Sequence, residues 1–155
     1  MKKIIFATLF ILLASTLSFG QTNSFGVGII VGEPTGLSMK LRLSENTAID
    51  GALGWSFEDK GSLHIHGDFL LHDYSLIHVD EGRLPIYYGI GGRIKLKNEN
   101  KGNDDDRIGV RVPVGLAYEF SSRKADIFLE IVPILDLTPE SQVSFNAALG
   151  ARYYF

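Results

Sequence analysis

Apolar and polar residues alternate along most of the chain, and the pattern is clearest at its end. From Val143 to Phe155 every odd position is apolar, whereas the even positions are polar, small or amphipathic. Successive side chains of a β-strand point to opposite faces of the strand. This segment is therefore predicted to be a strand with one apolar and one polar face.

The same alternation recurs in seven earlier segments: 24–32, 37–43, 49–57, 63–72, 86–96, 107–120 and 127–137. The fourth could continue towards Ile77, with a bulge near Asp73 and Tyr74. Stretches rich in glycine, proline and polar residues separate the segments and are interpreted as turns: 32–36, 44–47, 58–61, 79–83, 98–106, 121–124 and 138–142. Short turns favour hairpins, so the pattern predicts an all-β fold, an eight-stranded antiparallel up-and-down β-barrel.

The residues on the two faces indicate which face lies outside. The polar face carries many of the glycines, which suit a crowded interior, and the apolar face carries most of the bulky aromatic residues. This favours a transmembrane barrel with its apolar face towards lipid. The alternative is a soluble barrel that buries the apolar face. In the first case Phe25, Trp55, Val112 and Leu149 point outwards, and Arg111, Glu130 and Arg152 point inwards.

Residues 1–20 differ from the rest of the chain. Lys2 and Lys3 precede a short apolar run that ends in Ser18-Phe19-Gly20. A basic start, an apolar middle and small residues before the cut are typical of a cleaved signal peptide. The run is shorter than the roughly 20 apolar residues of a spanning helix, which disfavours the alternative of an uncleaved anchor. Residues 21–155 would then form the barrel domain.

The composition of the chain excludes several classes of protein. The chain has 15 basic and 18 acidic residues, and this acidic balance argues against a nucleic-acid partner. It contains no cysteine, which excludes disulfides and a lipoprotein anchor. After Gly20 no window holds 18 consecutive apolar residues, which excludes a helical membrane protein, but barrel strands need only about 9–11 residues.

Seven basic and six acidic residues lie on the predicted polar face. We expect them to pair in the interior, because a buried charge without a partner is costly. A selective pore would instead show a ring of one sign. The expected interior is therefore filled by side chains, and the alternative is a narrow pore or a small-ligand-binding barrel. The predicted charge network comprises Lys40, Arg42, Asp50, Asp68, Arg93, Lys95, Arg107, Arg111, Glu119, Asp126, Glu130, Asp136 and Arg152.

A histidine group on one predicted strand is the first candidate for chemistry. His64, His66, Asp68 and His72 share the polar face and could hold Zn²⁺. The His-x-His-x-Asp spacing resembles the start of metallo-hydrolase sites, but Phe69 follows where those sites have histidine. No second cluster supplies further ligands, so no metal site is expected.

The second candidate is the acidic run Asp104-Asp105-Asp106, which could gather divalent cations. It lacks the spacing of a calcium-binding loop and is interpreted as a solvated loop. No Ser-His-acid set stands out by its spacing. We therefore expect no cofactor and no enzymatic activity.

The signal peptide, the eight alternating segments and the terminal Ala-Leu-Gly-Ala-Arg-Tyr-Tyr-Phe resemble small outer-membrane barrels of the OmpA/OmpX type. This resemblance implies export to the outer membrane of a Gram-negative-type bacterium, with both termini in the periplasm. It also implies that the barrel-assembly machinery recognises Leu149, Ala151, Tyr153 and Phe155, and that the partners are outer-membrane lipid and lipopolysaccharide. The long outer loops of many OmpX-type barrels are missing. An envelope-structural or interaction role is expected; a lipid-modifying enzyme and a soluble periplasmic barrel are less favoured alternatives.

Overall fold

The computed structural model describes residues 24–56, 62–96 and 106–155. The predicted signal peptide, the turn 58–61 and nearly all of the turn 98–106 lie outside these described residues. The described part of the chain contains no helix of the length and apolar character that crossing a membrane requires.

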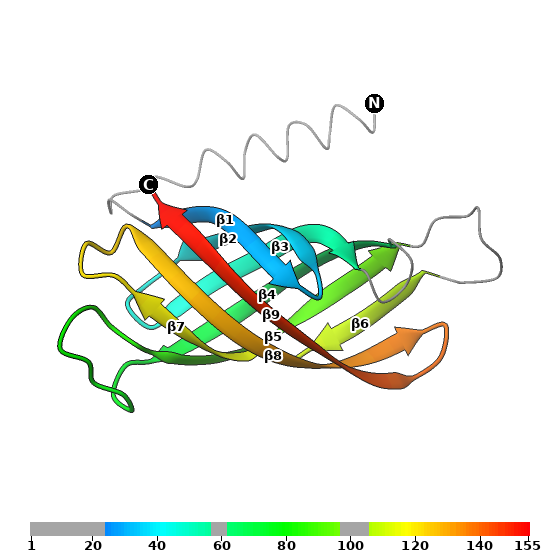
Figure 1. Cartoon of the computed structure of the whole chain (residues 1–155). Helices are drawn as coiled ribbons and strands as arrows, with labels where there is room; N and C mark the ends of the chain where they lie inside the picture. Colours follow the sequence, from blue (N-terminus) through cyan, green and yellow to red (C-terminus); the bar gives the residue numbers. More distant parts are fainter. Residues whose placement is uncertain (1–23, 57–61, 97–105) are drawn as a thin grey trace, which may run out of the picture.

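Nine antiparallel strands form one closed sheet (Figure 1). Within the described residues, consecutive strands pair from β1 to β6 and from β7 to β9, whereas β6 and β7 do not pair with each other and both lie between β5 and β8. β1 pairs with β9, which closes the ring. The start of β1 and the end of β9 lie at the same end, here named the terminus end; the opposite end is the far end. The strands are β1 (Phe25–Gly32), β2 (Thr35–Arg42), β3 (Thr47–Ser56), β4 (Ser62–Asp73), β5 (Ile86–Leu96), β6 (Arg107–Arg111), β7 (Val114–Glu119), β8 (Ala125–Thr138) and β9 (Gln142–Tyr154).

The predicted strand 107–120 is wrong as a single element, because it is divided into β6 and β7 at Pro113. Both pieces pair with β5 on one side and β8 on the other, in an unchanged register across the break. Proline has no N–H to donate to the ladder, whereas the neighbouring Val112 N–H still bonds to the Pro133 carbonyl at 3.0 Å. The ring therefore has eight positions, one of which is filled by two strands.

The predicted continuation of the fourth strand towards Ile77 is also wrong, since β4 ends at Asp73. The Asp73 carboxylate accepts hydrogen bonds from the Ser75 backbone N–H (2.8 Å) and hydroxyl (2.6 Å). Such a local turn competes with strand pairing. The connection to β5 is accordingly longer than the predicted turn 79–83. The irregularity expected near Asp73 occurs instead between Ile108 and Gly109, opposite β8.

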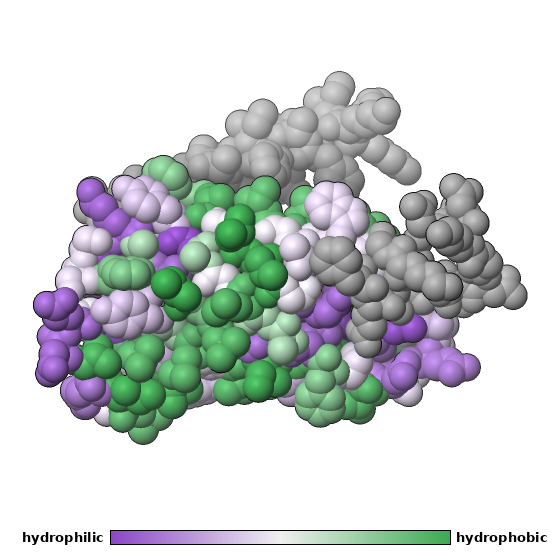
Figure 2. Space-filling view, in the orientation of Figure 1, coloured by the Kyte–Doolittle hydropathy of each residue, from purple (hydrophilic) through white to green (hydrophobic). Residues whose placement is uncertain are grey.

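The apolar face of the sheet points outwards. Trp55 is 57% exposed and Leu149 is 53% exposed, whereas Arg111 is 0% and Glu130 is 3% exposed. Phe25 and Val112 are exposed as well, and Arg152 is buried. Figure 2 shows a broad apolar surface over the middle of the barrel, with hydrophilic residues towards its ends. This distribution excludes a barrel that buries its apolar stripe, because the buried positions hold the charged residues.

Candidate functional site

The interior of the barrel gathers the charged residues of the predicted network. Of the thirteen residues in the predicted network, eleven are buried, and Arg42 and Arg107 are half-buried. Their positions follow from the alternation, because each occupies the inward phase of its strand. The structure therefore brings charges from distant parts of the sequence into one enclosed space.

Arg93 and Asp136 form a buried ion pair near the far end. Arg93 Nη2 lies 2.9 and 2.7 Å from the two Asp136 carboxylate oxygens, and Arg93 Nε donates to one of them at 3.1 Å. Arg93 Nη2 also donates to Ser144 Oγ at 3.2 Å. This forked geometry fixes the side chain across the interior from β5 to β8 and β9.

Arg111 joins two carboxylates at mid-height. Its Nε lies 2.9 Å from Asp68 Oδ2, and its Nη2 lies 3.2 Å from Glu130 Oε1. The Tyr87 hydroxyl donates to the other oxygen of Glu130 at 3.2 Å. One guanidinium thus bridges β4 and β8 through the centre of the barrel.

Arg152 makes a second bridge, nearer the terminus end. It contacts Asp50 at 3.0 Å and Asp126 at 3.8 Å, and it donates to Ser38 Oγ at 2.9 Å. Its guanidinium carbon lies 3.8 Å from the centre of the Phe128 ring, a cation–π arrangement. The Tyr154 hydroxyl completes the group by donating to Asp126.

Lys40 and Arg42 fill the interior at the terminus end. Lys40 Nζ lies 2.8 Å from His72 Nε2 and 3.9 Å from an Asp126 oxygen. The space left around them is about 150 Å³, and none of it is wide enough for a water-sized sphere. The side chains that line this space are therefore closely packed.

Loop residues extend the network across the terminus end. Glu119 contacts Arg42 at 3.4 Å, accepts a hydrogen bond from Tyr74 at 3.1 Å and pairs with Arg83. Arg83 also contacts Glu45 at 3.0 Å. Burial raises the pKa of the Tyr74 phenol above its ordinary value. The connection between β4 and β5 is thus tied to β7 and to the β2–β3 turn.

Several of these residues were missed by sequence reasoning. Tyr87, Phe128 and Tyr154 occupy inward positions, so the alternation contained the signal that they share the interior. Tyr74 and Arg83 lie in the β4–β5 connection. This connection has no alternation that would distinguish a side chain in contact with the barrel from one in solvent.

The histidine group is not brought together as a whole. His64 and His66 lie 3.3 Å apart, and His66 lies 4.0 Å from Asp68, but His72 lies at the terminus end with Lys40. Within the described ranges there is no group of three or more potential ligands placed to hold a metal ion. Asp104 and Asp105 fall outside these ranges, and Asp106 is exposed.

The residues of the predicted assembly signal lie on the outer face of β9. Leu149, Ala151, Tyr153 and Phe155 are exposed, and the rings of Tyr153 and Phe155 meet edge to face with 5.2 Å between their centres. The Phe155 N–H donates to the Phe25 carbonyl at 2.9 Å, which joins the end of the chain to β1.

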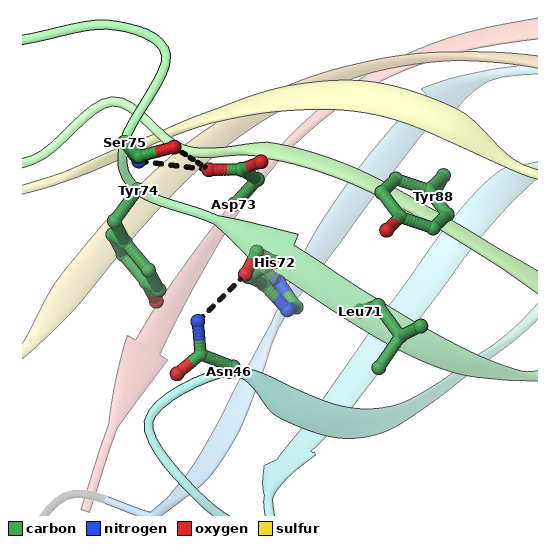
Figure 3. A pocket seen from close by; sticks show the side chains of 7 residues that line it. All are labelled: Asn46, Leu71, His72, Asp73, Tyr74, Ser75 and Tyr88. Atoms are coloured by element: carbon green, nitrogen blue, oxygen red, sulfur yellow. Dashed lines mark hydrogen bonds between the residues drawn. The ribbon is translucent and has the colours of Figure 1, made fainter.

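An open depression lies near the terminus end of β4 and β5 (Figure 3). Leu71 and Tyr88 supply its apolar part, and Asn46 donates to the His72 carbonyl at 3.0 Å. The remaining lining residues are His72, Asp73, Tyr74 and Ser75. The depression combines an apolar wall with a polar rim, as expected where the apolar band of the barrel ends.

A family model described as "Protein of unknown function (DUF3996)" matches residues 18–155. The chain belongs to this family. No curated protein matches it.

A crystal structure of the N-terminal β-barrel domain of OprF from Pseudomonas aeruginosa has a similar fold. The TM-score is 0.59 at 14% sequence identity, over 87% of this chain and 100% of that chain. A likeness at this identity concerns the fold alone. The expected small β-barrel is therefore confirmed as a fold, whereas the specific resemblance to the OmpA/OmpX type stays a prediction.

Proposed function

We propose that this protein is an outer-membrane β-barrel with an envelope-structural or interaction role and an interior closed by side chains. The observation that carries the proposal is the outward-facing apolar surface around a closed sheet. Ile29 of β1, Ile90 of β5 and Leu149 of β9 are each more than half exposed. In water so large an apolar surface would promote aggregation. In a bilayer it is the expected lipid-facing surface of the barrel.

The aromatic residues support the same proposal. Phe25, Tyr88 and Tyr153 are exposed towards the terminus end, and Trp55 and Phe145 are exposed towards the far end. Aromatic side chains prefer the two interfaces of a bilayer, where an apolar ring meets polar headgroups. By the same proposal residues 1–20 are a cleaved export signal, the periplasm holds the terminus end, and the partners are outer-membrane lipid, lipopolysaccharide and the barrel-assembly machinery.

The proposal assigns no catalytic activity to the barrel. Among the contacts of the described residues, His64 is paired with His66, and His72 is paired with Lys40. These contacts do not set a histidine between a serine and a carboxylate, as acyl-transfer chemistry requires.

Heat-modifiable migration on gels tests the proposal directly. The protein should be found in the membrane fraction and should migrate differently before and after boiling, because a barrel closed by backbone hydrogen bonds resists detergent. Recovery in the soluble periplasmic fraction, with no shift on boiling, would contradict it and favour the soluble alternative.

A second candidate function is a small-ligand-binding barrel. It is favoured by the polar atoms of the interior that have no hydrogen-bond partner, among them Asn146 Nδ2 and Oδ1. Buried polar groups without a protein partner are uncommon and indicate a bound water or ligand.

A further inference from the structure

The open depression near the terminus end of β4 and β5 has a volume of about 660 Å³ (Figure 3). Leu71 and Tyr88 form its apolar wall, and they lie directly opposite each other in the pairing of the two strands. The next outward pair towards the far end is Phe69 and Ile90, and all four side chains are exposed. The wall of the depression is therefore continuous with the outer apolar surface of the barrel.

Asp73 places a negative charge at the polar edge of the depression. It is the next outward residue of β4 after Leu71, and a step of two residues advances about 6.6 Å along a strand. The backbone N–H and the hydroxyl of Ser75 both donate to Asp73 Oδ1. These bonds orient the carboxylate and leave Oδ2 available as an acceptor.

The charge of Asp73 has no counter-charge within the depression. Among the described residues that line it there is no lysine and no arginine. The guanidinium of Arg83, on the same β4–β5 connection, is already paired with Glu45 and Glu119. The ring of His72 contacts Lys40 in the interior. The depression therefore presents a carboxylate to the outside and favours a cationic group.

We propose that this depression is a binding site for the headgroup of a phospholipid that carries an ammonium group. The N–H groups of the ammonium donate to Asp73 Oδ2, and its positive charge is attracted to the face of the Tyr88 ring. The acyl chains then lie against Leu71 and the apolar surface beyond it. An anionic headgroup would instead meet the charge of Asp73 without a basic side chain to offset it.

A lysine of another protein also carries an ammonium group, but the position of the depression favours a lipid. Its apolar wall runs into the outer surface formed by Phe69 and Ile90, which suits long acyl chains better than a charged peptide. The inference rests on the proposed function, because a lipid reaches this position only when the barrel lies in a bilayer.

The test uses the protein folded into nanodiscs that contain equal amounts of phosphatidylethanolamine and phosphatidylglycerol. Native mass spectrometry counts the molecules of each lipid that stay bound as the barrel is released from the disc. We expect the wild type to retain phosphatidylethanolamine in preference to phosphatidylglycerol.

Substitutions of Asp73 test the role of its charge. Asp73→Asn should lower the preference about two- to fivefold, the size expected of a solvent-accessible charge pair, and Asp73→Lys should reverse it. Asp80→Asn is the matched control, since Asp80 is an exposed acidic residue of the same connection that does not line the depression. It should retain the two lipids like the wild type.

A second pair of variants tests the aromatic ring. Tyr88→Leu keeps the wall apolar but removes the ring, so it should lower the preference for phosphatidylethanolamine. Tyr153→Leu is the control, because Tyr153 is an exposed aromatic residue at the terminus end of β9 and lies outside the depression. Its lipid retention should equal that of the wild type.

Soluble phosphoethanolamine distinguishes a lipid from its headgroup alone. It lacks acyl chains, so at an equal concentration it should not displace the bound phosphatidylethanolamine. Displacement would show that the apolar wall adds nothing, and it would overturn the assignment to a lipid.

Equal retention of the two lipids by the wild type, or the same loss of preference in Asp73→Asn and Asp80→Asn, would overturn the inference. Gel migration of each sample before and after boiling reports folding separately. A folded, inserted barrel without lipid preference rejects this site and leaves the proposed function standing, whereas a chain that does not insert rejects both.

Discussion

Arg93 and Asp136 illustrate how a single buried pair affects the stability of the barrel. Both side chains are almost fully buried, and their hydrogen bonds satisfy one another. Taking two charges out of water is costly, so such a pair contributes little compared with an apolar pair. Removing one partner of the pair is strongly destabilising, because the remaining charge is left buried and unpaired.

Asp136→Asn should lower the free energy of unfolding by about 3–5 kcal/mol, because it leaves the Arg93 guanidinium without a counter-charge. Urea unfolding in lipid vesicles, followed by the fluorescence of the single tryptophan, Trp55, measures this. The double variant Arg93→Met, Asp136→Leu is the control and should be close to the wild type. A double variant as unstable as Asp136→Asn would contradict the explanation by an unpaired charge.

Close packing against the backbone gives a second prediction for single residues. A Cβ at Gly28 would overlap the Ala151 carbonyl oxygen, whereas a Cβ at Gly67 would meet nothing nearer than Asp50 O at 3.8 Å. Gly28→Ala should therefore destabilise the barrel by about 1–3 kcal/mol, and Gly67→Ala should have little effect. The same urea titration compares them, and equal effects of the two substitutions would count against the packing argument.

At the scale of elements, β9 closes the ring. It pairs with β8 along nearly its whole length and with β1 from Gly26 to Gly32. It carries the residues of the proposed assembly signal. The element that completes the sheet is therefore also the element that the assembly machinery would recognise.

Phe155→Asp should reduce the yield of folded barrel in the membrane several-fold, because it removes the terminal aromatic of that signal. Heat-modifiable migration of the membrane fraction measures the yield. Phe120→Asp is the control, since Phe120 is also an exposed aromatic residue at the terminus end. A similar loss for both variants would show that any exposed aromatic matters and that Phe155 has no special role.

The turn between β2 and β3 supplies a prediction on pH. Hydrogen bonds from Arg123 and Arg83 hold the pKa of the Glu45 carboxyl below its ordinary value of 4.5. A lowered pKa means that these contacts stabilise the fold above pH 4.5 and are lost as the pH falls through the lower, folded-state value. Amide exchange of residues 43–46 should accelerate in that acidic range, and Glu45→Gln should be fast at every pH. Acceleration at neutral pH in the wild type would contradict the assignment.

Strand limits show how far the sequence could predict these elements. Alternation located every strand, because a half-exposed sheet needs a period of two. It continued through Pro113 because the break into β6 and β7 leaves the register unchanged. The end of β4 at Asp73 depends on hydrogen bonds to Ser75. These local bonds compete with continued pairing to a neighbouring strand, and the outcome depends on the partner strand as well as on the sequence of β4.

At the scale of the whole molecule, ion pairs in the interior join strands that are far apart in the sequence. Arg111, Arg152 and Lys40 each reach acidic residues on other strands and obstruct the axis at successive heights. Planar bilayers containing the folded protein should therefore show no steady, large conductance. The folded fraction in the same preparation should be verified by its gel shift. A stable open state of large conductance would contradict a closed interior and favour the narrow-pore alternative.

The sequence by itself determined the strands, their two faces and the set of charged residues on one face, because alternation along a strand is a local property. It also contained the signal that glycines and charges belong to one crowded side. Only the tertiary structure decided which charges pair, since each pair joins strands whose neighbours and heights depend on the register around the whole ring.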